Sequence, residues 1–250
     1  MAQRPGFPIK LDSKTAVKPA KLAVLPSVAI NPQGLGLDSS AVRQRMVQKL
    51  AAQGLKDPMV LHAMGTVERH RFVESALVNQ AYEDTSLPIG LGQTISKPNV
   101  VARMIELLRE GTTEKLGRVL EIGTGCGYQA AVLSLLAKDV YSIERIRSLH
   151  DSARAKLRPF RIANLRLIYA DGIRGLPQEA PFDGIILAAA GLGIPDPLLD
   201  QLAIGGKLIA PVAKSDSLQQ LLLIERLSSQ RYQRTTLDEV FFVPLQSGTM

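Results

Sequence analysis

The chain has 250 residues, of which 46% are hydrophobic and 21% charged, a composition typical of a soluble globular protein with a sizeable core. No apolar run approaches the roughly 20 residues that cross a bilayer, so neither a membrane-spanning protein nor a membrane partner is expected. The single cysteine, Cys126, excludes an internal disulfide and favours a reducing compartment, so we expect a cytoplasmic protein.

The net charge of +7 is concentrated at the start of the chain. Residues 1–37 carry five basic side chains against Asp12 alone, a charge of +4, which leaves +3 for the other 213 residues. This segment also holds five prolines and has no helical or strand period, so it is predicted to be a flexible basic tail. A solvated tail is the simpler interpretation, and a docking arm for an acidic partner is the alternative.

Folded structure is expected to begin at residues 38–40, where Asp and two Ser precede an apolar helical face. Gly54 is the expected C′ residue of this first helix. Asp57 and Pro58 are then expected to start a second short helix. These elements open a region, residues 38–117, that we expect to be mainly helical.

A glycine-containing segment follows at residues 87–97 and is expected to be a loop. Pro98 can occupy the first turn of the next helix, which is predicted over residues 98–108. Uncharged hydrogen-bonding groups precede that helix, where the N-terminus suits anions. These groups are Gln93, Thr94 and Ser96. On its position alone, Ser96 is more simply interpreted as the N-cap of this helix, and a ligand-binding role is the alternative.

From residue 118 onward, predicted strands alternate with helices or loops. The expected strands are 118–122, 140–144, 165–169, 184–188, 206–211, 218–225 and 239–243. Such alternation predicts a doubly wound α/β fold, with a mostly parallel seven-stranded sheet covered on both faces. The last two strands follow each other closely and are expected to form an antiparallel hairpin at one edge. We therefore expect a single domain over residues 38–250, with the sheet in 118–250.

The most informative motif is the glycine-rich turn that joins the first of these strands to a helix starting at Tyr128. Its glycines stand at alternate positions: Gly123, Gly125 and Gly127. Such a turn lets a ligand approach the main chain. Glu121 ends this strand and Glu144 ends the next one, where an acid commonly accepts hydrogen bonds from ribose hydroxyls. Together these features predict a nucleoside cofactor.

Two cofactors are compatible with this turn. The dinucleotide fingerprint needs a third glycine at position 128, which is Tyr in this chain. An acid followed by three alternating glycines suits S-adenosylmethionine, which has no pyrophosphate, so we favour it over NAD. A tight turn that binds nothing would leave Glu121 and Glu144 unexplained.

Two further strand ends are expected to reach the same ligand, because ligands of such sheets lie outside the carboxyl ends of the strands. Asp171 could accept from an adenine amino group, and Gly172 would let the ring lie close to the main chain. Taken alone, this pair would be only a turn. Ala188 and Ala189 leave space beside the cofactor, although core packing explains them equally well.

Several catalytic signatures are absent from the sequence. There is no G-x-S-x-G elbow, no H-E-x-x-H and no paired cysteines, so no metal is expected. The histidines are interpreted as structural, and Cys126 as a small residue in the glycine turn. A catalytic thiol is the alternative for Cys126, but no His or Lys stands nearby in the sequence to lower its pKa.

The chain resembles the protein-L-isoaspartate (D-aspartate) O-methyltransferase family from about residue 40 to 245. The resemblance is carried by residues 71–73, 88–96, 100–104, 119–129, 142–145, 171–172, 180–183, 205–206 and 242–245. It implies a Rossmann-like S-adenosylmethionine-dependent methyltransferase fold, and an enzyme that methylates the free carboxylate of L-isoaspartyl or D-aspartyl residues in damaged proteins and peptides. That reaction initiates repair and leaves S-adenosylhomocysteine.

The resemblance also implies the roles of particular residues. Ser96 would be the active-site serine and would contact the substrate with Ala188 and Ala189. The cofactor site would comprise Gln93, Thr94, Ile95, Ser96, Glu121, Gly123, Thr124, Gly125, Gly127, Glu144, Asp171 and Gly172. One departure is Gly191, where relatives often have Pro, which leaves the acceptor preference open. We expect a monomer with no nucleic-acid partner.

An absent general base agrees with this chemistry, because a carboxylate with a pKa near 4 is already ionised at neutral pH. The Ser96 hydroxyl is then expected to orient the acceptor and not to act as a nucleophile. Two other functions stay open: a methyltransferase-fold protein with an altered acceptor or a non-catalytic, partner-binding role, and a nucleic-acid methyltransferase drawn to its substrate by the basic tail.

Overall fold

The computed structural model describes residues 40–215 and 217–250, so the predicted tail lies outside the described residues. The described chain opens with helices α1 (Ser40–Ala52) and α2 (Pro58–Thr66). Gly54 follows α1 with a positive φ of 103°, and the Asp57 carboxylate caps α2 by accepting from the amides of Met59 and Val60. Both predicted helix boundaries are confirmed. Short 3-10 turns η1 (Arg69–Phe72) and η2 (Ser75–Gln80) lead on.

The segment expected to be a loop at residues 87–97 is instead a β-hairpin. Strand β1 (Leu87–Gly90) pairs with β2 (Gln93–Ile95) in a separate two-stranded antiparallel sheet. The turn residues that suggested a loop form the hairpin connection, where Leu91 has a positive φ of 54° between glycines at 92° and 70°. Helix α3 (Pro98–Arg109) then starts at Pro98, as predicted.

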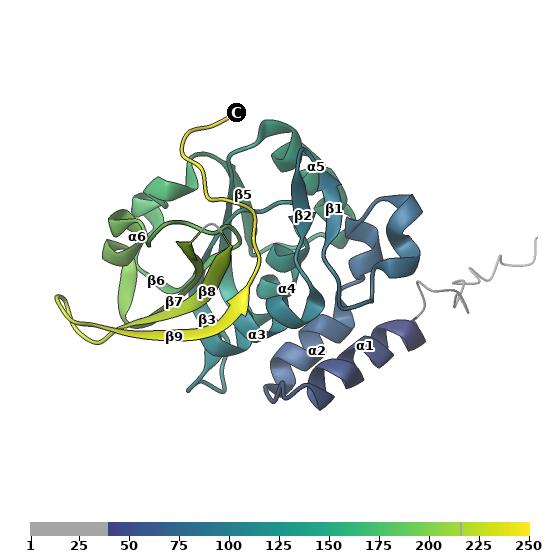
Figure 1. Ribbon diagram of the computed structural model, residues 1–250, viewed down its shortest axis with the longest axis horizontal. Helices are drawn as coiled ribbons and strands as arrows, with labels where there is room; N and C mark the ends of the chain where they lie inside the picture. The colour runs from purple at the N-terminus through teal and green to yellow at the C-terminus, as the bar shows by residue number, and fades with distance from the viewer. Residues whose placement is uncertain (1–39, 216) are drawn as a thin grey trace, which may run out of the picture. The chain divides into compact units, whose positions relative to one another are not determined.

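The main sheet of the described residues has seven strands in the order β5-β4-β3-β6-β7-β8-β9 (Figure 1). The strands are β3 (Leu116–Ile122), β4 (Ala137–Glu144), β5 (Leu165–Tyr169), β6 (Phe182–Leu187), β7 (Leu202–Ser215), β8 (Leu218–Arg226) and β9 (Tyr232–Val240). The first five strands in this order are parallel, and β8 and β9 are antiparallel to their neighbours. The mostly parallel sheet with an antiparallel edge is confirmed.

Helices cover both faces of this sheet. Besides α3, they are α4 (Tyr128–Leu136), α5 (Arg147–Leu157) and α6 (Asp196–Asp200), with short turns η3 (Arg158–Phe160), η4 (Gly172–Arg174) and η5 (Pro177–Glu179). Val119 of β3 packs in the cluster that includes α2, α3 and α4, whereas its neighbour Leu120 packs in the cluster that includes α6. Side chains of successive strand residues therefore pack against helices on opposite faces of the sheet, as a doubly wound fold requires.

The last strand was predicted at residues 239–243 but runs from Tyr232 to Val240, so the predicted position is wrong. Strand β9 lies at the sheet edge and most of its side chains are exposed. Its sequence therefore lacks an apolar strand signal. The apolar run Phe241–Val243, which attracted the prediction, lies beyond the strand.

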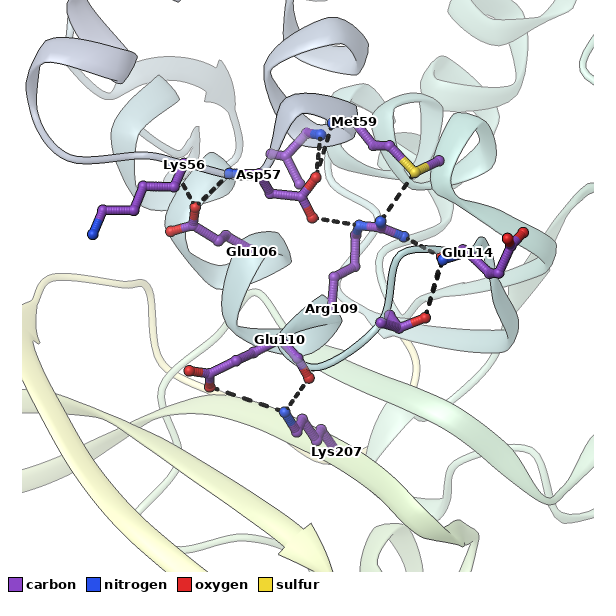
Figure 2. A network of polar contacts seen from close by, with 10 residues as sticks. Lys56, Asp57, Met59, Glu106, Arg109, Glu110, Glu114 and Lys207 are labelled. Atoms are coloured by element: carbon purple, nitrogen blue, oxygen red, sulfur yellow. Dashed lines mark hydrogen bonds and ion pairs between the residues drawn. The ribbon is translucent and has the colours of Figure 1, made fainter.

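A buried ion pair joins the start of α2 to the end of α3 (Figure 2). The Arg109 side chain is almost fully buried and donates from Nε to Asp57 Oδ2 at 2.8 Å. Its other nitrogens donate to the Glu114 carbonyl at 2.8 Å and contact Met59 Sδ at 3.1 Å. Asp57 thus caps one helix and neutralises a cation on another.

Replacing Asp57 with Ala should lower the free energy of unfolding by about 3–5 kcal/mol, because it removes the α2 cap and leaves the Arg109 charge buried without its partner. Urea denaturation of the two proteins measures this loss. The control is Asp139→Asn, which breaks the exposed pair with Arg166 and should leave the free energy of unfolding nearly unchanged. Equal losses in the two variants would contradict the expectation.

Candidate active site

A pocket lies at the carboxyl ends of β3, β4 and β6, with residues 93–96 of the β2 hairpin strand and the following turn on another side. It brings together most residues that the sequence pointed to: Gln93, Thr94, Ile95, Ser96, Gly123, Thr124, Gly125, Glu144, Gly172, Ala188 and Ala189. Segments more than 90 residues apart thus meet around one space. Glu121, Gly127 and Asp171 do not line this pocket, although each is next in the chain to a residue that does.

Main-chain hydrogen bonds hold the glycine turn against the end of β4. The amides of Gly123 and Thr124 both donate to the Ile143 carbonyl, at 2.8 and 3.2 Å. All three turn glycines have positive φ, and a Cβ on Gly123 would touch Ala188 at 3.4 Å. The turn therefore presents bare main chain to the pocket, as the sequence predicted.

Gly127 has a different role in this structure from the other two glycines. A Cβ there would stand only 2.8 Å from Leu157 Cδ1 and 3.5 Å from the Ala153 methyl group, both on α5. The missing side chain lets α5 pack against the start of α4. Gly127 thus supports the pocket through packing.

Glu144 is buried and accepts two main-chain hydrogen bonds. One carboxylate oxygen accepts from the Gly125 amide at 2.8 Å, and the other accepts from the Ile146 amide at 2.9 Å. It therefore fixes the glycine turn and the start of α5 relative to β4. A carboxylate oxygen has two lone pairs, so each can still accept from a ligand hydroxyl.

Glu121 is fully buried beneath the glycine turn. One of its oxygens accepts from the Ser142 hydroxyl, which is also bonded to the Thr124 hydroxyl. The other oxygen has no partner among the described residues, and neither does the Nε2 of Gln129 in the pocket wall. Burial raises the pKa of the Glu121 carboxyl to about 8, against the lowering effects of the Ser142 hydrogen bond and of the nearby Gln129 amide. Glu121 is therefore protonated at neutral pH in this state.

Asp171 caps η4 and reaches the C-terminal segment. Its Oδ1 accepts from the Ile173 amide at 3.0 Å, and its Oδ2 accepts from the Gly248 amide at 2.8 Å. Gly172 lines the pocket beside it, and a Cβ there would stand 2.4 Å from a methyl group of Ile122. The structure thus uses this acid to fasten the chain that borders the pocket.

Residues 243–246 complete the pocket wall and were not named as site residues from the sequence. In Figure 1 this yellow segment leaves β9 and passes beside β2 on its way to the C-terminus. The Leu245 amide donates to the Ala190 carbonyl at 2.8 Å, which ties the segment to the end of β6. Sequence reasoning recognised the Phe-Val-Pro-Leu run only as a family motif, because its place depends on the path of the chain after the sheet.

Ser96 lies in the pocket and does not cap α3. The cap position is Lys97, which makes no side-chain hydrogen bond to the helix. The N-cap interpretation of Ser96 is therefore wrong. The Asp84 carboxylate, from the preceding loop, instead accepts from the Asn99 amide of α3 at 3.0 Å. The Ser96 carbonyl accepts from Nη2 of the buried Arg69 at 2.7 Å.

Cys126 and Tyr128 also line the pocket, whereas none of the histidines among the described residues does. Burial raises the pKa of the Cys126 thiol, so the reactive thiolate is disfavoured. This supports the interpretation of Cys126 as a small packing residue. His62, His70 and His150 are engaged locally by Thr66, Tyr82 and Asp151.

The chemistry of these groups fits an adenosyl sulfonium ligand. The Glu121 carboxyl and the Gln129 amide have no other hydrogen-bond partner for the oxygen and the N–H that they turn toward each other, so both can bind an amino acid moiety, and Glu144 lies at the ribose position of the fold. Among residues 40–215 and 217–250 there is no cluster of three or more His, Cys, Asp or Glu side chains that could hold a metal. Within the same ranges, every helix is too short or too polar to cross a membrane.

Comparisons with known proteins identify the family of the chain. The family described as "Protein-L-isoaspartate(D-aspartate) O-methyltransferase (PCMT)" matches residues 41–250. A protein-L-isoaspartate O-methyltransferase of Cupriavidus pinatubonensis is 62% identical over 222 residues, covering 85% of this chain and 75% of that protein. One of Janthinobacterium sp. is 57% identical over 239 residues, covering 95% and 80%.

Solved structures give the same result. A protein-L-isoaspartate O-methyltransferase has a TM-score of 0.74 at 26% identity, over 82% of this chain and 66% of that one, just under two thirds of its length. A Plasmodium falciparum protein in complex with S-adenosyl-L-homocysteine, described as a putative member, has a TM-score of 0.68 at 25% identity over 82% and 98%.

Binding of S-adenosylhomocysteine at pH 7 should release about one proton, because Glu121 is protonated below pH 8 and ionises when a ligand ammonium group is bound nearby. The affinity should then fall as the pH is lowered below 8, where the ligand competes with the proton. Calorimetric titrations in buffers of different ionisation enthalpy measure the release. The Glu121→Gln variant should bind S-adenosylhomocysteine without releasing this proton. Equal proton release by the variant and the wild-type protein would contradict the assignment of the proton to Glu121.

Proposed function

The chain belongs to the protein-L-isoaspartate(D-aspartate) O-methyltransferase family, and we propose that the pocket at the strand ends is where it performs the family reaction. The enzyme transfers the methyl group of S-adenosylmethionine to the free carboxylate of isoaspartyl residues in damaged proteins. The observation that carries the proposal is the meeting of Ser96 with the glycine turn in one pocket.

Each part of the cofactor has a matching group in the site. The bare main chain at Gly123 and Gly125 would lie against the methionyl portion, whose ammonium would face Glu121. Glu144 would accept from the ribose hydroxyls, and the flat surface at Gly172 would carry the adenine. When bound, S-adenosylmethionine supplies a methyl group that is already activated by the sulfonium.

Asp171 would support adenine binding indirectly, because it holds the turn that contains Gly172. Both of its oxygens accept main-chain hydrogen bonds, so it keeps Gly172 and the C-terminal segment in place. Gln93, Thr94 and Ile95 would border the same ligand from the hairpin. Thr124 would help indirectly, since its hydroxyl belongs to the Ser142–Glu121 chain.

Ser96 would act by orienting the acceptor carboxylate. That carboxylate is ionised at neutral pH, so the site needs no general base. A hydroxyl that donates to one carboxylate oxygen leaves the other free to approach the methyl carbon in line with sulfur. Ala188 and Ala189, across the pocket, are small enough to admit the acceptor. Alignment of this kind supplies several kcal/mol, up to roughly 7–11 in ideal cases.

We also propose that the enzyme works as a cytoplasmic monomer on proteins and peptides, without nucleic acid or membrane. The free, buried Cys126 supports a reducing compartment. The modest charge of residues 38–250, +3, gives no reason to expect a polyanion. Residues 38–250 would then form the catalytic domain, with residues 1–37 as an appended tail.

The decisive experiment compares an isoaspartyl peptide with its normal aspartyl twin as methyl acceptors from labelled S-adenosylmethionine. Transfer to the isoaspartyl peptide alone is expected. Transfer to both alike would remove the repair assignment but keep the methyltransferase one. No transfer to either would favour an altered acceptor or a partner-binding role, and transfer to RNA that weakens steeply with salt would favour a nucleic-acid enzyme.

Ser96→Ala should lower kcat at saturating peptide by roughly 10- to 100-fold, because a hydrogen bond to a charged group contributes about 1.5–3 kcal/mol. Steady-state kinetics with an isoaspartyl peptide measure the change, and S-adenosylhomocysteine should still bind. Ser86→Ala, in the segment before the hairpin and outside the pocket lining, is the matched control and should keep wild-type kcat. Near-normal kcat in Ser96→Ala would defeat the orienting role.

A further inference from the structure

Arg69 is a fully buried arginine that contacts the active-site segment from behind. It is the first residue of η1, and its Nε donates to the Ala81 carbonyl at 2.8 Å. Its Nη2 donates to the Ser96 carbonyl at 2.7 Å. The guanidinium also lies over the ring of Tyr128, 4.8 Å from its centroid, and Tyr128 lines the pocket. Arg69 thus links the serine segment to the helix that follows the glycine turn.

Arg69 forms no ion pair among the described residues, and its Nη1 has no hydrogen-bond acceptor there. The Tyr128 side chain and the more distant Asp84 carboxylate offset part of its charge, because both raise the pKa of the guanidinium. Arg109, the other fully buried arginine, has the Asp57 carboxylate at 2.8 Å (Figure 2). Burial lowers the pKa of Arg69, but a guanidinium remains charged at neutral pH.

A buried, unpaired cation is costly, so a structure that keeps one directly behind a binding pocket gains from its field there. The anion available to that field is the acceptor carboxylate, held at Ser96 under the proposed function. The ligand on the other side of the pocket is cationic and has Glu121 and Glu144 near it instead. Arg69 would thus complement the anionic acceptor, whereas Glu121 and Glu144 would complement the cationic cofactor.

We propose that Arg69 is a positioning residue that holds the Ser96 segment by hydrogen bonds and attracts the isoaspartyl carboxylate with a charge that no ion pair among the described residues neutralises. The inference rests on the proposed function. During transfer an oxygen–carbon bond forms while the sulfur–carbon bond breaks, and its electron pair stays on sulfur. The anionic acceptor and the cationic donor become a neutral ester and thioether. The field of Arg69 thus favours the bound carboxylate more than the transition state.

This charge balance predicts a specific kinetic signature. Arg69→Met should raise the KM for an isoaspartyl peptide about tenfold or more, with a smaller change in kcat, because removing the charge weakens ground-state binding most. Arg69→Lys keeps the charge but loses the two-pronged contact with the carbonyls. It should keep KM within about threefold of wild type and lower kcat, since the serine segment is held less firmly.

Arg109→Met is the matched control, because it removes an equally buried arginine that lies at the end of α3, outside the pocket lining. It should lower the thermal stability and leave KM unchanged. The affinity for S-adenosylhomocysteine, measured by calorimetry, should change less than about threefold in the Arg69 variants, since Glu144 and the glycine turn are intact.

Several outcomes would overturn the inference. They are a wild-type KM in folded Arg69→Met, a KM in Arg69→Lys as high as in Arg69→Met, an equal rise in Arg109→Met, and a parallel loss of S-adenosylhomocysteine affinity. If Arg69→Met does not fold, the Arg69→Lys result decides, and a raised KM there counts against the charge. Failure of the wild-type protein to methylate the isoaspartyl peptide would instead defeat the proposed function.

Discussion

The pocket depends on how the glycine turn is held at the end of β4. The Ile143 carbonyl accepts two amides of the turn, and Glu144, the next residue, accepts a third from Gly125. Two consecutive residues at the end of β4, Ile143 and Glu144, therefore fix the position and orientation of the glycine turn. Because β4 is paired with β3 and β5 on its two sides, this stretch is itself fixed by the sheet. The flexible glycines thus occupy a rigid site, which is the preorganisation that an aligned methyl transfer needs.

Burial of charge is the second organising feature of the molecule. Two buried acids, Glu121 and Glu144, lie at the ends of β3 and β4, and the buried Arg69 donates to the carbonyl of Ser96 on the hairpin side of the pocket. By contrast, Arg109 is paired with Asp57 and joins α2 to α3. Two arginines of equal burial thus differ in whether the fold supplies a counter-charge. Under the proposal for Arg69, the acceptor carboxylate of the substrate would supply the missing ion-pair partner, and the acceptor preference would then depend on a residue outside the pocket lining.

Much of the architecture follows from local sequence signals. The apolar runs of β3 to β8 and the glycine turn were recognisable, because buried parallel strands and tight turns have distinctive compositions. The exposed edge strand β9 has no such signal, and its predicted position was displaced into Phe241–Val243. The β1–β2 hairpin was predicted as a loop, because its two strands are short and the glycines of its connection are typical loop residues. The position at a strand end pointed to Glu144 and the family resemblance pointed to Ser96, and both line the pocket. The contact of Asp171 with Gly248 depends on tertiary structure.

The position of the lone cysteine has a practical consequence. Cys126 is buried and borders the cavity, and the sequence contains no other thiol. A maleimide or disulfide reagent can therefore modify the protein only when this wall opens to solvent. The labelling rate reports the frequency of such opening in the unmutated enzyme. A bound ligand would lower the labelling rate of Cys126, so opening of the cavity can be followed over time without an engineered probe.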